Sequence, residues 1–256
     1  MGPPPAACTD AERRAANELH DRLRAAGHEA WVETVWVRPR WAWSIALHCA
    51  LAVIGGLVAI AAPVPGLVIA AVGAVGLGAE ALDLPGPLRL LMRRRATQNV
   101  LVEPRHPGRV ALLLVAHYDA RPAGRAARLL PTLRPWLALA ALAVATSAAG
   151  RLAGVEGAAL GAAQLVPTVA LLLGAALAVE AALARASQPA PGATTAIELL
   201  ARPLPERYSA GLVLYGGGGP AALRTHLRRE KLRAIVVEVS DADTPARVEA
   251  RLSLLG

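Results

Sequence analysis

The sequence predicts an α/β fold with a mostly parallel sheet and flanking helices, into which two transmembrane helical hairpins are inserted. Helical patterns alternate with short apolar strands near the amino terminus, around residue 110 and after residue 188. Two long apolar blocks interrupt this alternation. Hydrophobic residues make up 55% of the 256 residues, and the mean hydropathy is +0.42. Such a composition is unusual for a soluble protein and indicates membrane segments.

Residues 1–40 are predicted to supply the first helix and strand of the α/β domain. Thr9 and Glu12 have the spacing of a capping box, in which the two side chains satisfy free backbone N–H groups. The segment that follows, residues 11–26, is typical of an amphipathic helix. Residues 29–37 alternate in polarity and are rich in Val and Trp, which predicts a strand.

Residues 41–84 are predicted to form the first transmembrane hairpin. The stretch 45–79 contains no charged residue, and a Pro-Val-Pro-Gly sequence at 63–66 interrupts it. Because one span needs roughly 17–25 residues, this length fits two spans joined by a turn. His48 is expected to be a tolerated polar residue of the first span, and Glu80 an interfacial residue at the edge of the second.

Residues 133–184 are predicted to form the second hairpin. Its two spans, 135–150 and 157–179, are separated by a short loop that contains Arg151 and Glu156. No charged residue is expected within any of the four spans, which argues against a transporter or a channel.

Arginine residues flank the hairpins on one side only, and they predict the orientation of the chain. The loops within the hairpins carry almost no charge. The positive-inside rule therefore places the termini and the α/β domain in the cytoplasm of a four-span membrane protein. The net charge of +8 is accounted for by these scattered arginines, so nucleic acid is not an expected partner. Membrane lipid is the expected partner, and another membrane protein is a further candidate. The flanking arginines are Arg38, Arg40, Arg89, Arg93, Arg94, Arg95, Arg121, Arg125, Arg128, Arg134 and Arg185.

Residues 98–124 are predicted to hold the core of the α/β domain. The sequence QNVLVEPRHPGRVALLLVAHYDA contains a buried strand at 110–116 that ends in His117, Tyr118 and Asp119. This stretch resembles the start of the catalytic domain of family twenty-eight metallopeptidases, the co-catalytic zinc aminopeptidases. The resemblance extends over the parts of the chain between residues 98 and 243 that lie outside the hairpins.

The resemblance implies an α/β fold and two zinc ions, held by His, Asp and Glu side chains at the ends of strands. Two ions roughly 3.5–4 Å apart need a bridging carboxylate, and the attacking water needs a general base. His117 and Asp119 match the first motif of the family, in which the His binds metal and the Asp orients it. Glu238, at the end of a later strand, matches a third carboxylate position. Zinc is thus a cofactor that the resemblance implies, with these three residues as a vestigial metal site that is not expected to hold a catalytic pair of ions.

The remainder of the domain, residues 188–256, departs from the family pattern. Gln188 stands where the bridging carboxylate is expected, and Gly216–Gly219 replace the general base and one ligand. The distal His has no counterpart, because His226 lies one strand too early. We expect the four glycines to reflect a loop that no longer carries catalytic side chains. A phosphate-binding turn is the alternative, but no Lys-Ser/Thr follows the glycines.

The remaining elements after residue 188 are expected to alternate between helix and strand. They are a helix at 193–201, a strand at 211–215, a helix at 220–230 and a strand at 234–239.

Two functions follow from these departures. The first is a membrane-anchored, zinc-peptidase-like protein that has lost hydrolysis and serves as a binding or scaffold protein. The alternative is an active zinc-dependent aminopeptidase that uses substitute ligands. A third reading is that the distal His lies beyond Gly256 in a longer chain, although this would not repair Gly216–Gly219.

Overall fold

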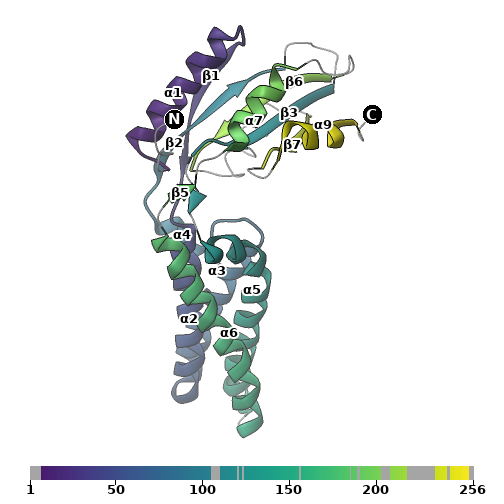
Figure 1. The fold of residues 1–256 in the computed structure, drawn as a ribbon. Helices are drawn as coiled ribbons and strands as arrows, with labels where there is room; N and C mark the ends of the chain where they lie inside the picture. The colour runs from purple at the N-terminus through teal and green to yellow at the C-terminus, as the bar shows by residue number, and fades with distance from the viewer. Residues whose placement is uncertain are drawn as a thin grey trace. The chain divides into compact units, whose positions relative to one another are not determined.

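The computed structural model describes most of the chain and divides it into two compact units (Figure 1). The α/β unit comprises Met1–Pro39, Arg94–Arg121 and Ala186–Gly256, and the helical unit comprises Arg40–Arg93 and Pro122–Arg185. The described residues are 7–104, 110–119, 121–122, 124–155, 157–184, 186–188, 191–202, 208–217, 234–240 and 243–253.

The α/β unit is built on a five-stranded sheet with the strand order β1-β2-β6-β3-β7. The strands are β1 (Ala30–Val37), β2 (Arg95–Val102), β3 (Val110–His117), β6 (Tyr208–Tyr215) and β7 (Ala234–Glu238). β3 pairs in parallel with β6 and β7, whereas β2 pairs antiparallel with β1 and β6. The sheet is therefore mixed, and the prediction of a mostly parallel sheet is wrong. The helical hairpin of α2 and α3 lies between β1 and β2 in the chain. A hairpin brings the chain back to the side from which it left, so β2 runs antiparallel to β1.

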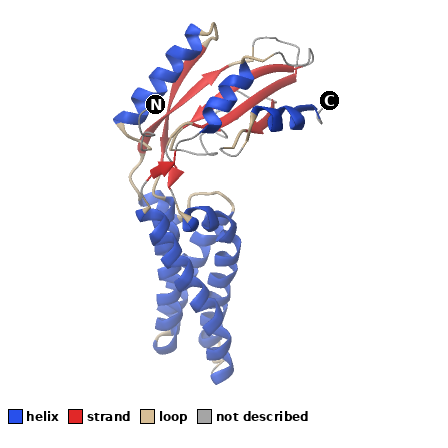
Figure 2. Cartoon of the chain, viewed as in Figure 1, coloured by secondary structure: helices blue, strands red, loops and turns tan. Residues whose placement is uncertain are grey.

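Helices α1 (Asp10–Ala25), α7 (Pro191–Leu200) and α9 (Pro245–Ser253) contribute to the hydrophobic core on one face of this sheet (Figure 2). Leu114 of β3 points to that face, and its neighbours Leu113 and Val115 belong to a second buried cluster on the opposite face. The alternation expected of a strand with both faces buried is thus present.

The helical unit contains the four predicted spans as helices. All four are long enough and apolar enough to cross a membrane. The helices are α2 (Trp41–Ala61), α3 (Pro63–Ala81), α5 (Arg125–Leu152) and α6 (Ala158–Leu183). α5 begins before the predicted hairpin and includes Pro131 and Pro135.

Small residues bring α2 and α3 close together. A Cβ atom added at Gly55 would lie 2.7 Å from the Cα of Ala70, and one added at Gly73 would lie 2.8 Å from the carbonyl oxygen of His48. Glycines at such contacts are the usual means by which membrane helices approach each other.

Four elements were not predicted from the sequence. They are α4 (Pro87–Leu91), α9 and the two strands of a small separate sheet, β4 (Arg121–Pro122) and β5 (Ala186–Gln188).

Candidate functional site

The candidate site lies at the carboxyl ends of β3, β6 and β7. His117 is the last residue of β3 and lies opposite Tyr215, the last residue of β6. Glu238 ends β7 and lies opposite Val115, two residues before His117. Because residues two apart in a strand share a face, His117, Tyr215 and Glu238 lie on the same face of the sheet.

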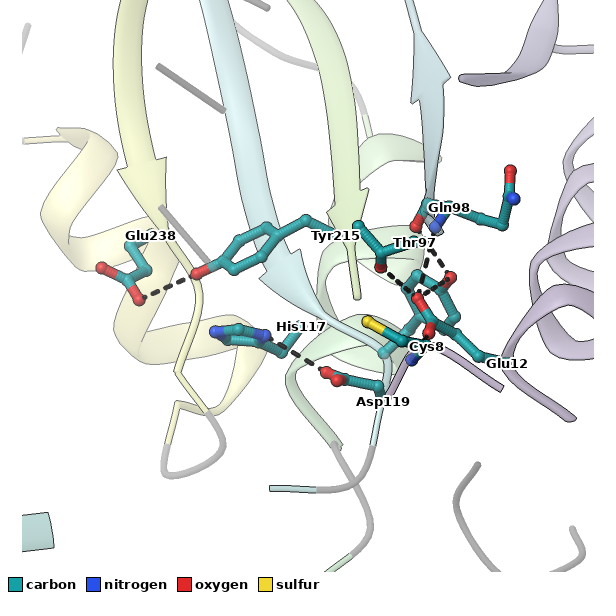
Figure 3. A network of polar contacts seen from close by, with 9 residues as sticks. Cys8, Glu12, Thr97, Gln98, His117, Asp119, Tyr215 and Glu238 are labelled. Atoms are coloured by element: carbon teal, nitrogen blue, oxygen red, sulfur yellow. Dashed lines mark hydrogen bonds and ion pairs between the residues drawn. The ribbon is translucent and has the colours of Figure 1, made fainter. Parts of the chain in front are cut away.

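Tyr215 contacts two of the three predicted site residues, His117 and Glu238 (Figure 3). The rings of His117 and Tyr215 are tilted by 54° with their centroids 3.8 Å apart. The Tyr215 hydroxyl donates a hydrogen bond to Oε1 of Glu238 over 3.4 Å. The fold therefore brings His117 and Glu238 together around a tyrosine that the sequence did not single out. Its only sequence signal is its position at the end of an apolar strand.

Asp119 lies beside the imidazole of His117. The Nδ1 atom of His117 and Oδ1 of Asp119 are 3.3 Å apart, and both side chains are largely buried. The orientation is not that of a hydrogen bond, and neither atom has another hydrogen-bond partner among the described residues. The carboxylate occupies the Nδ1 side of the ring, so Nε2 is the nitrogen that faces away from it (Figure 3). A carboxylate that orients a ligating histidine accepts a hydrogen bond from its other ring nitrogen, and this pair has the proximity but not the hydrogen-bond geometry.

The described side chains do not fit a zinc centre. A zinc site needs at least three protein ligands, and no three His, Cys, Asp or Glu residues among those described are placed to hold a metal ion. The carboxylate of Glu238 is engaged by the Tyr215 hydroxyl. The side chain of Gln188 and the whole of His226 lie outside the described residues. Zinc binding at His117 stays a prediction.

Glu12 is a buried carboxylate at this end of the sheet that the sequence placed only in a helix cap. It is 1% exposed. Its Oε1 accepts hydrogen bonds from the Thr97 hydroxyl, from the Gln98 N–H over 3.3 Å and from the Tyr118 hydroxyl over 3.2 Å. Its Oε2 accepts one from the Cys8 N–H. Glu12 thereby ties the start of α1 to β2 and to the residue after β3 (Figure 3).

The predicted capping box is present in part. The Thr9 hydroxyl oxygen accepts a hydrogen bond from the Glu12 N–H over 3.4 Å, which is one half of the motif. The carboxylate of Glu12 does not close the motif on Thr9. It reaches the backbone N–H of Cys8 and the sheet instead.

Two of the four glycines are required by this packing. A Cβ atom added at Gly216 would lie 2.8 Å from Cδ of Glu12 and 2.9 Å from Oγ1 of Thr97, and one added at Gly217 would lie 2.6 Å from Cβ of Ala7. Besides lacking catalytic side chains, the loop is therefore constrained at both positions, because the start of α1 and the residues before it fill the space. Gly218, Gly219 and the helix predicted at 220–230 lie outside the described residues.

The buried carboxylates keep nearby groups protonated. Burial, and then the negative charges of Glu12 and Asp119, raise the pKa of the Cys8 thiol to about 11, and Arg95 opposes the shift. The same causes, with burial the largest, raise the pKa of Tyr118 far above its usual value. Since the thiolate is the reactive form of cysteine, Cys8 is not an activated nucleophile at neutral pH.

Comparison of the chain with protein-family models, with curated proteins and with solved structures finds no match in any of the three.

Proposed function

We propose that the chain is a membrane-anchored, zinc-peptidase-like protein that does not hydrolyse peptides and acts as a binding or scaffold protein. One observation carries the proposal. The resemblance requires a general base and a ligand directly after β6, where Gly216–Gly219 stand, and at Gly216 the space that a side chain would need is filled by Glu12.

Glu12 is a poor substitute for that base. A general base must reach the attacking water, and such assistance is typically worth about 10²–10⁴-fold in rate. The Glu12 carboxylate is buried and already accepts hydrogen bonds from two hydroxyls and two backbone N–H groups. Its role is to hold α1 against the sheet.

The alternative is an active enzyme that uses substitute ligands, and one observation favours it. Asp119 lies on the Nδ1 side of His117, which leaves Nε2 directed away, as in a metal-binding histidine. This function would need ligands in addition to His117, Asp119 and Glu238.

An aminopeptidase assay with added zinc, together with the metal content of the purified protein, separates the two functions. We expect no turnover that depends on His117 and no loss of bound zinc in His117→Ala. His20→Ala is the matched control, because His20 also lies beside an aspartate, with its Nδ1 2.9 Å from Oδ1 of Asp21 on the surface of α1. Turnover that disappears on chelation and in His117→Ala, but persists in His20→Ala, contradicts the proposal.

The proposal includes the orientation of the protein. The arginine asymmetry supports a cytoplasmic α/β unit, with the turns near Pro65 and Gly154 on the other side of the membrane. Single cysteines at these two turns, in a chain without Cys8 and Cys49, should react with an impermeant reagent in intact cells. A cysteine at Arg14 should react only after the membrane is opened. The reverse labelling pattern contradicts this orientation.

A further inference from the structure

We propose that residues 82–94, called here the anchor segment, lie in the membrane surface and bind anionic phospholipid headgroups. The segment follows α3 and includes the short helix α4. The segment belongs to the helical unit except for Arg94, with which the α/β unit resumes, and the inference does not depend on whether the protein has lost hydrolysis.

The anchor segment exposes an unusual amount of apolar surface. Leu82 is 73% exposed, Leu84 55%, Leu90 52% and Leu91 83%. Single exposed leucines are ordinary on protein surfaces, whereas a group of this kind marks an interaction site. The segment directly follows a helix that is apolar enough to cross a membrane. The boundary region of the bilayer is therefore the surface that covers these leucines.

Contacts within the helical unit place the segment at the level of the headgroups. Asp83 accepts a hydrogen bond from Nη1 of Arg134 over 3.0 Å, and the guanidinium carbon of Arg134 lies 4.9 Å from the ring centroid of Trp41. Trp41 is the first residue of α2. Tryptophan is enriched at the membrane–water interface, where an arginine can also reach water. Because Asp83 contacts Arg134, the first residues of the anchor segment lie at the same depth as Trp41, near the membrane–water interface.

The charges of the segment are divided between the protein interior and the outside. Arg89 is directed inward, where its Nη1 donates to Oε2 of the buried Glu80 over 3.1 Å. Arg93 and Arg94 are exposed and have no ion-pair partner among the described residues. Basic side chains next to a membrane helix attract anionic lipids. Exposed leucines with unpaired arginines thus fit a bilayer surface with phosphate headgroups better than they fit an apolar protein partner.

A fluorescent probe at residue 91 tests the depth of the segment. The full chain with Leu91→Cys, and with Cys8 and Cys49 replaced by alanine, is labelled with an environment-sensitive dye and placed in phosphatidylcholine nanodiscs. We expect a spin label near the headgroup end of the lipid chains to quench the dye. The same dye at Val68, an exposed residue of α3, is the positive control, and the dye at Arg14 of α1 is the control in the α/β unit. Quenching at residue 91 no greater than at residue 14 overturns the proposal and leaves these leucines to a protein partner.

The same probe tests the choice of headgroup. At equal mole fraction, spin-labelled phosphatidylglycerol should quench residue 91 roughly two- to fivefold more effectively than spin-labelled phosphatidylcholine, a range set by the attraction of one basic residue to an anionic surface. Arg93→Gln with Arg94→Gln should bring the ratio close to one and leave quenching by phosphatidylcholine unchanged. Arg14→Gln with Arg24→Gln, exposed on α1, is the charge-matched control and should preserve the ratio.

Two outcomes contradict the choice of headgroup. One is a ratio that Arg93→Gln with Arg94→Gln leaves unchanged. The other is a ratio that inorganic phosphate abolishes at matched ionic strength, because the arginines would then form a site for a free anion.

Discussion

Each of the two units buries a glutamate, but the two carboxylates are stabilised by different kinds of partner. Glu12 of the α/β unit is 1% exposed and Glu80 of the helical unit is 0% exposed. The recorded donors to Glu12 are hydroxyls and backbone N–H groups, all of them neutral. Glu80 has a cation as its partner, the Arg89 guanidinium at 3.1 Å.

Glu80 belongs to a polar cluster at one end of the helical unit. Its Oε1 accepts a hydrogen bond from the Ser44 hydroxyl over 2.9 Å, and the Ser44 oxygen lies 3.4 Å from Nδ1 of the buried His48. Glu80 was expected only as an interfacial residue at the edge of a span, and the structure adds that it is buried and paired with Arg89 of α4. Hydropathy along the sequence could not detect this contact.

The difference predicts unequal consequences when each glutamate is removed. Loss of one member of a buried ion pair leaves an uncompensated charge, which costs about 3–5 kcal/mol. Loss of an acceptor from neutral donors costs about 1–3 kcal/mol. The helical unit should therefore be the more sensitive of the two to the loss of its glutamate.

The largest effect is expected for Glu80→Ala. It removes the carboxylate that the mostly buried Arg89 guanidinium contacts and should destabilise the helical unit by about 3 kcal/mol. In a chain of this size, the thermal midpoint should fall by roughly 6–12 °C, measured by tryptophan fluorescence in detergent. Arg89→Ala added to Glu80→Ala should recover part of the loss. A double variant that is less stable than Glu80→Ala would refute the ion-pair argument.

The next effect tests the packing of Glu12. Gly216→Ala places a methyl group against the Glu12 carboxylate and should cost about 1–3 kcal/mol by overpacking. Glu12→Ala vacates that space, so the two changes together should cost less than the sum of the two alone. Gly78→Ala is the control, because a Cβ at that helical position meets nothing within 4 Å. Additive losses would show that Glu12 does not occupy the space beside Gly216.

A smaller effect is expected for Glu12→Gln. The side chain keeps its shape, but its amide group now faces donors such as the Cys8 N–H or the Thr97 hydroxyl, at a cost of about 1–2 kcal/mol. Glu18→Gln on the same helix is the matched control. Glu18 pairs with Arg22 at the surface, where such pairs are worth about 0–1 kcal/mol. Equal midpoints for the two variants in thermal unfolding would contradict the role of Glu12.

The smallest effect concerns chemical reactivity. With the pKa of Cys8 raised to about 11, only about one thiol in a thousand is ionised at pH 8, and alkylation of the chain with Cys49→Ala should be slow. Because the thiolate is the reactive form, the rate should rise about tenfold per pH unit up to that pKa. Glu12→Gln removes a negative charge that raises this pKa, so alkylation at pH 8 should become faster. Alkylation at pH 8 at the rate of a free cysteine would refute the electrostatic account of Cys8.

Part of the candidate site was predictable from local patterns. A buried strand that ends in His-Tyr-Asp places His117 and Asp119 at the edge of a sheet, and a later apolar strand ends in Glu238. The roles of Tyr215 and Glu12 could not be predicted. The contacts of Tyr215 depend on which strands pair, and those of Glu12 depend on where α1 begins.

The sequence by itself determined the elements whose signal is local. Four long apolar segments specify four helices, and short apolar runs specify the strands. The signal is local because the apolar residues recur with the period of the helix or strand whose face they bury. Only the tertiary structure decided that β2 pairs antiparallel with both of its neighbours, that Glu12 fills the space beside Gly216, and that Glu80 meets Arg89. A buried carboxylate must find donors wherever the fold places them, and no local pattern along the chain records that distant partner.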